Sequence, residues 1–527
     1  MKRKLPIGEQ DFASIRQKGA VYVDKTELIY KLITGSGSQF FFSRPRRFGK
    51  SLLCSTFAAL FEGRRELFQE IAGMPALAID KLDWDWKPYP VIRIDLNAGD
   101  YLQGQERLET ALSTSLENTA RKYKIELRGQ YPSTQFTNII VDLHEKYGPV
   151  AVIIDEYDKP LLATLDEPKL HRLMVSSLKS FYSVLKSQDG NLKFVFITGV
   201  SKFSHISIFS DLNHLTDISL SESYNDLCGF TQKEINANFA PEIREAAKKN
   251  KLPKAQYLQE LKDFYNGYRF SQNKITVHNP YGLLNHFFDD YKFAPYWFGR
   301  GTPTFLINLI RSQKIDVLHL ENYYFNASDL QKFDINNMDA VTVLYQTGYL
   351  TIVDFDDDRK QYILDYPNRE IKSCFSESLV EEYFETGENH RSDFMNYIIR
   401  CIFDCEIDKM MERLKSFLKE IPNTIIEDRE KYFQTVLHLI FRMFGFNCRS
   451  ETALSDGRVD TLLETKKTLY LFEFKYDKSA KEALTQIDTK EYLLAWKYSG
   501  KELYKIGVNF SGKERNITEW QWVKVTA

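Results

Sequence analysis

Apolar runs of strand length, separated by helical stretches, dominate the first 220 residues of this chain and constrain its fold more than any other feature. The runs are QFFFS (39–43), YPVIRIDLN (89–97), GPVAVIIDEYD (148–158) and LKFVFITGVS (192–201). Helical patterns lie between them, and a short strand near Ile218 follows the last run. Strands buried on both faces read as nearly continuous apolar runs, and parallel strands require helical crossovers. The pattern therefore predicts an α/β fold with a parallel sheet covered on both faces.

Size and composition limit the class of protein. With 527 residues the chain exceeds one ordinary core, so we expect two or three domains. The formal net charge of −2 means that nucleic-acid contact requires a local basic patch. No apolar run approaches the ~20 residues of a membrane span, and the amino-terminal MKRKLPIGEQDF lacks the apolar segment of a signal peptide. The six cysteines are scattered, and Cys401 and Cys405 have no second Cys or His pair to complete a zinc set. We therefore expect buried free thiols in a reduced, cytoplasmic protein.

The later parts of the chain have different patterns. Up to about residue 400 the sequence is mainly helical and aromatic, and 340–368 predicts a helix followed by a hairpin around Asp356–Arg359. That outline is typical of a small winged-helix or lid module. The last part predicts a helix, two strands joined by a turn at 465–467, a helix with Gln486 and a further strand. The expected domains are 1–225, 226–405 and 406–527, the last a separate small α/β domain.

A phosphate-binding pattern lies at FFFSRPRRFGKSLL. A strand, a loop and a helix in this order place backbone N–H groups and a helix N-terminus around an anion, with Lys50 for the phosphates and Ser51 for magnesium. Gly49 allows close backbone approach. The first glycine of the usual pattern is replaced by Arg44, and Pro45 can fix that turn instead. The predicted nucleotide-binding residues are Arg44, Pro45, Arg46, Arg47, Phe48, Gly49, Lys50, Ser51 and Leu52.

An apolar strand that ends in acids supplies the second half of such a site. Asp155 would hold magnesium through water, and Glu156 would orient or activate the attacking water. Both lie at the carboxyl end of a predicted parallel strand, where α/β ligands bind. A capped strand end is the alternative reading. Thr198, at the end of the next strand, is either a polar sensor of the γ-phosphate or a satisfied strand-end hydroxyl.

The arginines of the loop allow two readings. One of Arg44, Arg46 and Arg47 can stabilise transition-state charge, as an arginine finger does. Surface pairing with acids or a nucleic-acid contact is the alternative, and we favour it. Arg300 is a further candidate, for a lid arginine.

These motifs resemble in combination those of the bacterial AAA-ATPase-like family, whose phosphate loop is typically written R-P-R-R-F-G-K-S. The matching stretches cover most of residues 1–290 and include FFSRPRRFGKSLL, VIIDEYDKPL, FVFITGVSKFSHISIFSDLN and FYNGYRF. The resemblance implies a P-loop NTPase domain with an ASCE-type sheet, ATP as the nucleotide and Mg²⁺ as its metal. It also implies that an arginine at position 44 is normal, and that Asp24 lies near the nucleotide base.

A second group of charged residues lies near the carboxyl end, in GRVDTLLETKKTLYLFEFKY. Strand alternation places Glu473 and Lys475 on one face, and Asp460 on the preceding strand. Two carboxylates can hold magnesium, and a lysine beside them can position water or neutralise phosphate. The strand is apolar enough that an unpaired Glu and Lys would be costly there. A plain surface pair of Glu473 and Lys475 is the alternative.

The order of elements in this last part resembles the PD-(D/E)XK nuclease superfamily, a restriction-endonuclease-like α/β domain. The resemblance implies Asp460, Glu473 and Lys475 as the catalytic set, with Mg²⁺ or Mn²⁺ at the two carboxylates and Gln486 as a helper. Glu430 is a further candidate, although an acid at a helix N-terminus is favoured by the helix dipole alone.

Three hypotheses follow for the whole chain. The first is an ATPase that controls a magnesium-dependent nuclease, with DNA as the favoured substrate and a role in defence or mobile-element biology. The second is a nucleotide-regulated module that binds nucleic acid or a partner without cutting. The third is a signalling ATPase that assembles into oligomers. Metal-dependent cleavage distinguishes the first from the other two.

Overall fold

The computed structural model describes residues 3–202, 214–298, 304–313, 315, 320–326, 330, 339–384, 388–419, 430–443, 447–454, 457–465, 467–497 and 499–525. The chain divides into two compact units. The first comprises Met1–Gly299, Asn308–Gln313 and Glu321–Asn368; the second comprises Arg300–Ile307, Lys314–Leu320 and Arg369–Ala527. Residues 369–405, expected at the end of the middle domain, fall in the second unit, and the three-domain boundaries stay a prediction.

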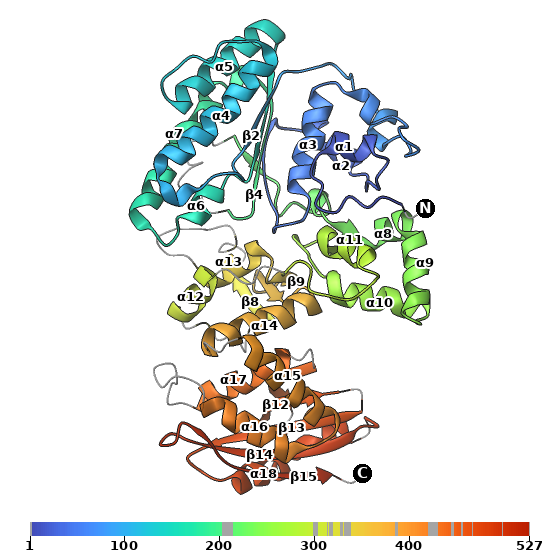
Figure 1. Cartoon of the computed structure of the whole chain (residues 1–527), viewed down its shortest axis with the longest axis vertical. Helices are drawn as coiled ribbons and strands as arrows, with labels where there is room; N and C mark the ends of the chain where they lie inside the picture. The colour runs from blue at the N-terminus through green and yellow to red at the C-terminus, as the bar shows by residue number, and fades with distance from the viewer. Residues whose placement is uncertain are drawn as a thin grey trace. The chain divides into compact units, whose positions relative to one another are not determined.

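A parallel five-stranded sheet forms the centre of the first unit, as predicted (Figure 1). Its strands are β1 (Gln39–Ser43), β2 (Val91–Asp95), β3 (Val150–Asp155), β4 (Leu192–Gly199) and β5 (Thr216–Asp217). The order is β2-β3-β4-β1-β5, and every pairing is parallel. Because β4 lies between the strand before the phosphate loop and the strand that ends in acids, the sheet has the ASCE order. The carboxyl ends of β1, β3 and β4 meet at one edge.

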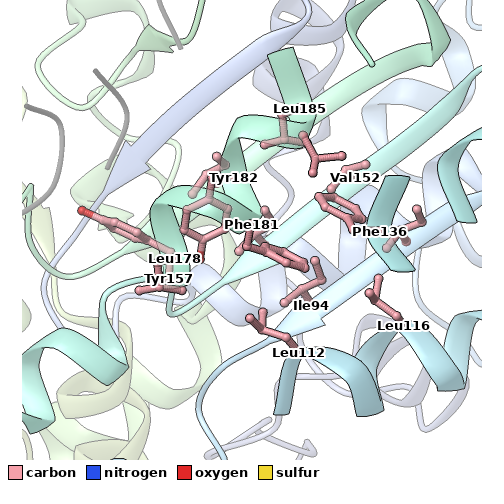
Figure 2. Close-up of a cluster of buried hydrophobic side chains, with 14 of the residues drawn as sticks. Ile94, Leu112, Leu116, Phe136, Val152, Tyr157, Leu178, Phe181, Tyr182 and Leu185 are labelled. Carbon is pink, nitrogen blue, oxygen red and sulfur yellow. The ribbon is translucent and has the colours of Figure 1, made fainter. Parts of the chain in front are cut away.

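Helices cover both faces of this sheet because its strands alternate between two apolar sets. On one face, Val152 of β3 and Val195 of β4 pack with side chains of three helices in a single cluster (Figure 2). These helices are α4 (Gln105–Tyr123), α5 (Pro132–Tyr147) and α7 (Pro168–Ser187). Phe136 of α5 and Phe181 of α7 stack there with ring centres 4.5 Å apart, a contact worth about 0.5–1.5 kcal/mol beyond its buried area.

The opposite face carries phenylalanines. Phe194 and Phe196 of β4 contact Phe57 of α3 (Lys50–Phe61), with ring centres 5.1 and 4.7 Å apart. Two short helices, α1 (Phe12–Gln17) and α2 (Thr26–Thr34), precede the sheet, and α6 (Lys159–Ala163) follows β3. The helix that begins with the Gly-Lys-Ser tripeptide is therefore fixed against the sheet by aromatic packing.

The remainder of the first unit is helical, with two small sheets. Its helices are α8 (Gln232–Asn238), α9 (Ala240–Lys249), α10 (Lys254–Tyr265), α11 (Pro280–Phe288) and α13 (Ala340–Thr347). Strands β6 (Phe230–Thr231) and β7 (Val277–His278) pair with each other. The predicted helix and hairpin are α13, β9 (Thr351–Asp356) and β10 (Gln361–Asp365), and β8 (Tyr323–Asn326) adds a third strand that was not expected. Helix α12 (Thr304–Ser312) has residues in both units.

The second unit combines helices with a mixed sheet in the order β11-β12-β13-β14-β15. The strands are β11 (Asn447–Leu454), β12 (Gly457–Glu464), β13 (Thr468–Tyr476), β14 (Glu502–Ser511) and β15 (Asn516–Val525). The helices are α14 (Arg369–Phe384), α15 (Glu388–Phe403), α16 (Ile407–Lys419), α17 (Glu430–Met443) and α18 (Ala480–Thr489). The expected helix, hairpin, helix and strand are α17, β12–β13, α18 and β14. The two edge strands, β11 and β15, were not expected.

No helix in the described parts of the chain combines the length and the apolar character that crossing a bilayer requires.

Candidate functional site

The phosphate loop connects β1 to α3 at the carboxyl edge of the parallel sheet. Gly49 is the N-cap of α3 with φ of +94°. Apart from Gly49 and its two chain neighbours, no described residue has an atom within 4 Å of the place where its Cβ would be. Glycine adopts this left-handed conformation without the steric cost that a Cβ brings. The open space beside Gly49 allows a ligand to approach the backbone closely.

The loop and the first turn of α3 present a series of backbone N–H donors. Six N–H groups meet no acceptor within the described part of the chain, and they are those of Arg46, Arg47, Gly49, Lys50, Ser51 and Leu52. The first intrahelical donor is Leu53, whose N–H donates to the Gly49 carbonyl at 3.0 Å. Consecutive N–H groups at a helix N-terminus bind anions, and the helix dipole adds to the attraction. The backbone alone therefore favours a phosphate here.

Lys50 and Glu156 lie together beneath this loop. The Lys50 side chain is 3% exposed, its ammonium donates to the Pro45 carbonyl at 3.3 Å, and it lies 3.6 Å from a Glu156 carboxylate oxygen. Glu156 has a φ of +51°. A left-handed φ is unusual outside glycine and turns the chain sharply after β3. The turn brings the second acid of the motif to the lysine of the loop.

Asp155 and Ser51 supply adjacent oxygens at the same edge. The Asp155 carboxylate is hydrogen-bonded to the Ser51 hydroxyl and accepts the Glu156 N–H at 3.0 Å. Burial raises the pKa of Asp155 to about 6, and the negative charge of Glu156 adds to this rise, whereas the Ser51 hydrogen bond opposes it. Hydroxyl and carboxylate oxygens are ligands that Mg²⁺ accepts, usually with several waters retained. The donor set therefore fits a magnesium ion.

Thr198 is buried, and its hydroxyl donates to the Phe42 carbonyl at 2.7 Å. A hydroxyl has one proton, so this geometry leaves Thr198 no donor for a phosphate oxygen. Of the two interpretations drawn from the sequence, the geometry favours a satisfied strand-end hydroxyl.

Arg44 faces the protein interior. Its guanidinium carbon lies 4.2 Å from the centre of the Phe42 ring and 4.1 Å from that of Phe270. Its N–H groups donate to four backbone carbonyls, those of Ser43, Ser219, Tyr224 and Asn225. Burial lowers the pKa of Arg44 to about 10. This geometry favours a structural role, in place of the phosphate contact or arginine finger considered from the sequence.

The other loop residues differ in exposure. Arg46 and Arg47 are exposed, and Arg47 stacks on Tyr281 with its guanidinium carbon 3.9 Å from the ring centre. Phe48 is 1% exposed, and Leu52 is half-buried on the first turn of α3. Arg46 and Arg47 are thus the loop arginines that a ligand can reach. Arg300 lies outside the described residues.

Asp158 was not singled out from the sequence, although it closes the DEYD motif. Its buried carboxylate accepts the N–H of Val200 at 3.2 Å, and both the N–H and the hydroxyl of Ser201 at 2.7 and 2.5 Å. Burial raises its pKa, and the charge of Glu156 adds to the rise. Asp158 therefore ties the turn after β3 to the end of β4. A third acid two positions after a two-acid strand end is the signal that could have found it.

In the second unit, Asp460, Glu473 and Lys475 lie close together on neighbouring strands. Asp460 of β12 accepts the Phe474 N–H at 2.7 Å, which brings it beside β13. The Lys475 ammonium lies 3.1 Å from a Glu473 carboxylate oxygen and donates to the Phe474 carbonyl at 3.0 Å. The Glu473 side chain is 1% exposed and that of Lys475 14% exposed. The surface-pair alternative does not fit this degree of burial.

Helix α18 covers the face of the sheet that carries these side chains. Leu471, two residues before Glu473, clusters with Ile487 of α18, whereas Phe472 contacts Phe441 of α17 with ring centres 5.1 Å apart. Glu473 therefore points to the α18 side. Its register partner on β14 is Gly507, where a Cβ would lie 2.3 Å from the Ala480 carbonyl oxygen. A glycine at this position lets α18 pack against the strand beside Glu473.

Gln486 is half-buried on α18, and within the described residues its side chain makes no hydrogen bond. The side chain of Glu430 lies outside what the structure describes. No group of three or more His, Cys, Asp or Glu side chains suited to a metal is present among the described residues. Lys475 contacts a Glu473 carboxylate oxygen and the Phe474 carbonyl, and the Asp460 carboxylate lies on the neighbouring strand. Such a set fits a magnesium ion that retains water ligands.

Comparison with known proteins gives matches for both sites. Residues 6–209 match the family model described as "Predicted AAA-ATPase", and residues 428–520 match that of the "PD-(D/E)XK nuclease superfamily". The chain is also similar over 528 aligned positions to a protein of Azotobacter chroococcum mcd 1, described as "Uncharacterized protein in vnfD 5'region", with 34% identity. The alignment covers 98% of both proteins. Both resemblances inferred from the motifs are confirmed.

Proposed function

Since the chain belongs to the AAA-ATPase-like family and ends in a PD-(D/E)XK nuclease superfamily domain, we propose that it hydrolyses ATP and cleaves nucleic acid at two separate sites. Nucleotide binding and hydrolysis at the first site control cleavage at the second. DNA is the proposed substrate, and defence or mobile-element biology the proposed context.

One observation carries the ATPase half of the proposal: a row of N–H groups around Gly49 that meet no acceptor among the described residues, with Lys50 and Glu156 close by. The N–H groups bind phosphate oxygens, and Lys50 adds its charge to them. Glu156 would orient the attacking water or take its proton. Ser51 and Asp155 would hold Mg²⁺. When bound, Mg²⁺ offsets the charge on the phosphate oxygens.

The nuclease half rests on the buried Glu473–Lys475 pair beside Asp460. Taking both charges out of water costs several kcal/mol, so a buried Glu–Lys pair is more typical of a functional site than of a structural one. Lys475 would orient a water or stabilise the charge of a phosphodiester under attack. Asp460 and Glu473 would hold Mg²⁺ or Mn²⁺. The bound metal would stabilise the negative charge that develops at the phosphorus and on the leaving oxygen.

A cleavage assay tests the proposal. Linear and circular duplex DNA, single-stranded DNA and RNA are incubated with the protein, ATP, and Mg²⁺ or Mn²⁺. We expect Lys475→Ala to lower cleavage about 100-fold or more while ATP hydrolysis continues. Lys50→Ala is expected to abolish ATP hydrolysis and to remove the ATP dependence of cleavage. Lys505→Ala is the matched control, because it removes a lysine of the same sheet that pairs with the exposed Asp488.

The outcomes separate the hypotheses. ATP hydrolysis with no cleavage of any substrate would favour the nucleotide-regulated binding module. Cleavage that is equal in the parent and in Lys475→Ala would refute the assignment of the catalytic set. A cleavage rate that changes neither on addition of ATP nor in Lys50→Ala would refute control by the ATPase.

A further inference from the structure

The five loop residues from Arg44 to Phe48 contact residues that come much later in the sequence of the first unit. Arg44 donates to carbonyls of residues 219, 224 and 225. Phe48 packs edge-on against Tyr268 and Phe270, with ring centres 4.7 and 5.6 Å away. The loop is therefore not a free connection between β1 and α3.

Two further contacts hold the middle of the loop. A Cβ built on Gly348, the C-cap of α13, would lie 2.7 Å from the Pro45 Cβ, so this glycine packs directly on the proline. Tyr281 of α11 stacks under the Arg47 guanidinium, 3.9 Å from ring centre to carbon. Neither contact acts on a backbone polar group of the loop.

Trp297 does act on the backbone. Its indole N–H donates to the Arg46 carbonyl oxygen at 2.9 Å. A trans peptide holds its C=O and its N–H antiparallel, so fixing the Arg46 carbonyl also fixes the direction of the Arg47 N–H. That N–H is one of the loop donors that meet no acceptor within the described part of the chain. The Trp297 ring is in turn held edge-on against Tyr349, with ring centres 5.6 Å apart.

We propose that Trp297 is a positioning residue for phosphate binding, which orients the Arg47 N–H toward the ligand through the Arg46 carbonyl. This inference rests on the proposed nucleotide site and deepens it. Trp297, which lies outside the loop motif, thus takes part in recognition of the phosphates. The ligand group concerned is a di- or triphosphate, since a nucleoside without phosphate has no anionic oxygen for this N–H to bind.

Trp297→Phe tests the inference because it removes the indole N–H and keeps an aromatic ring against Tyr349. Loss of one hydrogen bond to the backbone is expected to weaken the binding of ADP and of inorganic pyrophosphate about 2- to 12-fold. Adenosine affinity is expected to stay unchanged. Trp84→Phe is the matched control, because the Trp84 indole N–H is buried and has no partner within the described residues.

Tryptophan emission supplies a second measurement. Addition of pyrophosphate is expected to change the emission of the parent and of Trp84→Phe, and to leave that of Trp297→Phe nearly constant. Circular dichroism and the melting temperature of each variant, without ligand, check that the fold is kept. An equal loss of affinity for adenosine and for pyrophosphate would indicate a general structural role and would overturn the inference.

Failure of this inference is distinguishable from failure of the proposed function. If the parent binds neither ADP nor pyrophosphate, the nucleotide site itself is refuted and the role of Trp297 falls with it. If the parent binds both and Trp297→Phe binds them equally well, only the role of Trp297 is refuted.

Discussion

Asp155, which would hold the metal, is buried in the folded protein, and burial disfavours the charged form of its carboxylate. Asp155 is 5% exposed, and burial raises the pKa of its carboxylate from 3.8 to about 6. The unfolded chain therefore loses this proton at a lower pH than the folded chain does. Stability is highest below about pH 4 as far as this group is concerned, and it falls as the pH rises toward 6.

Asp155→Asn should therefore stabilise the first unit at pH 7 while abolishing magnesium-dependent ATP hydrolysis. The shift corresponds to at most about 3 kcal/mol, and the retained Ser51 hydrogen bond will reduce the gain. Chemical denaturation at pH 7 and pH 5 measures it, and the difference from the parent should shrink at pH 5. A variant less stable than the parent at pH 7 would contradict the burial argument.

Arg44 gives a second prediction at the residue scale. Arg44→Gly restores the glycine of the usual phosphate-loop pattern but removes four hydrogen bonds to carbonyls and a cation between two rings. We expect a loss of more than about 3 kcal/mol in unfolding free energy. Arg46→Gly is the control, since that side chain is exposed and its carbonyl remains available to Trp297. Equal stability of the two variants, measured by denaturant unfolding, would show that Arg44 contributes no more than an exposed arginine.

Among the secondary-structure elements, the position of α18 depends on a close approach to β14. A Cβ at Gly507 would lie 2.3 Å from the Ala480 carbonyl oxygen and 3.0 Å from the Ala483 Cβ. The backbone of Ala480 cannot yield without moving the helix. Because Gly507 pairs with Glu473 in the sheet, such a shift acts directly beside the proposed catalytic side chains.

Gly507→Ala should therefore lower nucleic-acid cleavage and leave ATP hydrolysis intact. We expect a loss of about 1–3 kcal/mol in the stability of the second unit, as for other overpacked sites. Gly190→Ala is the control, since no described residue other than its chain neighbours has an atom within 4 Å of that Cβ position, and the φ of Gly190 is not in the left-handed region. Cleavage by Gly507→Ala at the parent rate would show that the helix adjusts without disturbing the site.

For the molecule as a whole, the two compact units lead to an expectation about unfolding. The phosphate loop belongs to the first unit, and Asp460, Glu473 and Lys475 belong to the second. Domains with separate cores often unfold in separate transitions, and a ligand stabilises the unit that binds it.

Scanning calorimetry should show two transitions, of which Mg²⁺·ADP raises only one. At 100 times its dissociation constant the ligand adds about 2.7 kcal/mol to that unit. The same transition should rise in Asp155→Asn without ligand, and the other should fall in Gly507→Ala. A single transition that moves as one in every case would contradict the independence of the units.

The sequence by itself determined the α/β class, the loop and strand ends that carry Lys50 and Asp155, and the Glu473–Lys475 strand. These follow from local patterns, because a buried strand, a glycine turn and strand alternation each need only a few neighbouring residues. The edge strands β11 and β15 were missed since their polar residues break that pattern.

Only the tertiary structure decided the strand order, the interior position of Arg44 and the contact of Trp297 with the loop. Each of these depends on residues far apart in the chain. The Arg46 carbonyl and the Trp297 indole are 251 positions apart. Local sequence periodicity does not predict a contact between residues so far apart. From the sequence, Arg44 is predicted to be a charged loop residue. In the folded protein it is buried, because later segments of the chain supply the carbonyls and the Phe270 ring that surround it.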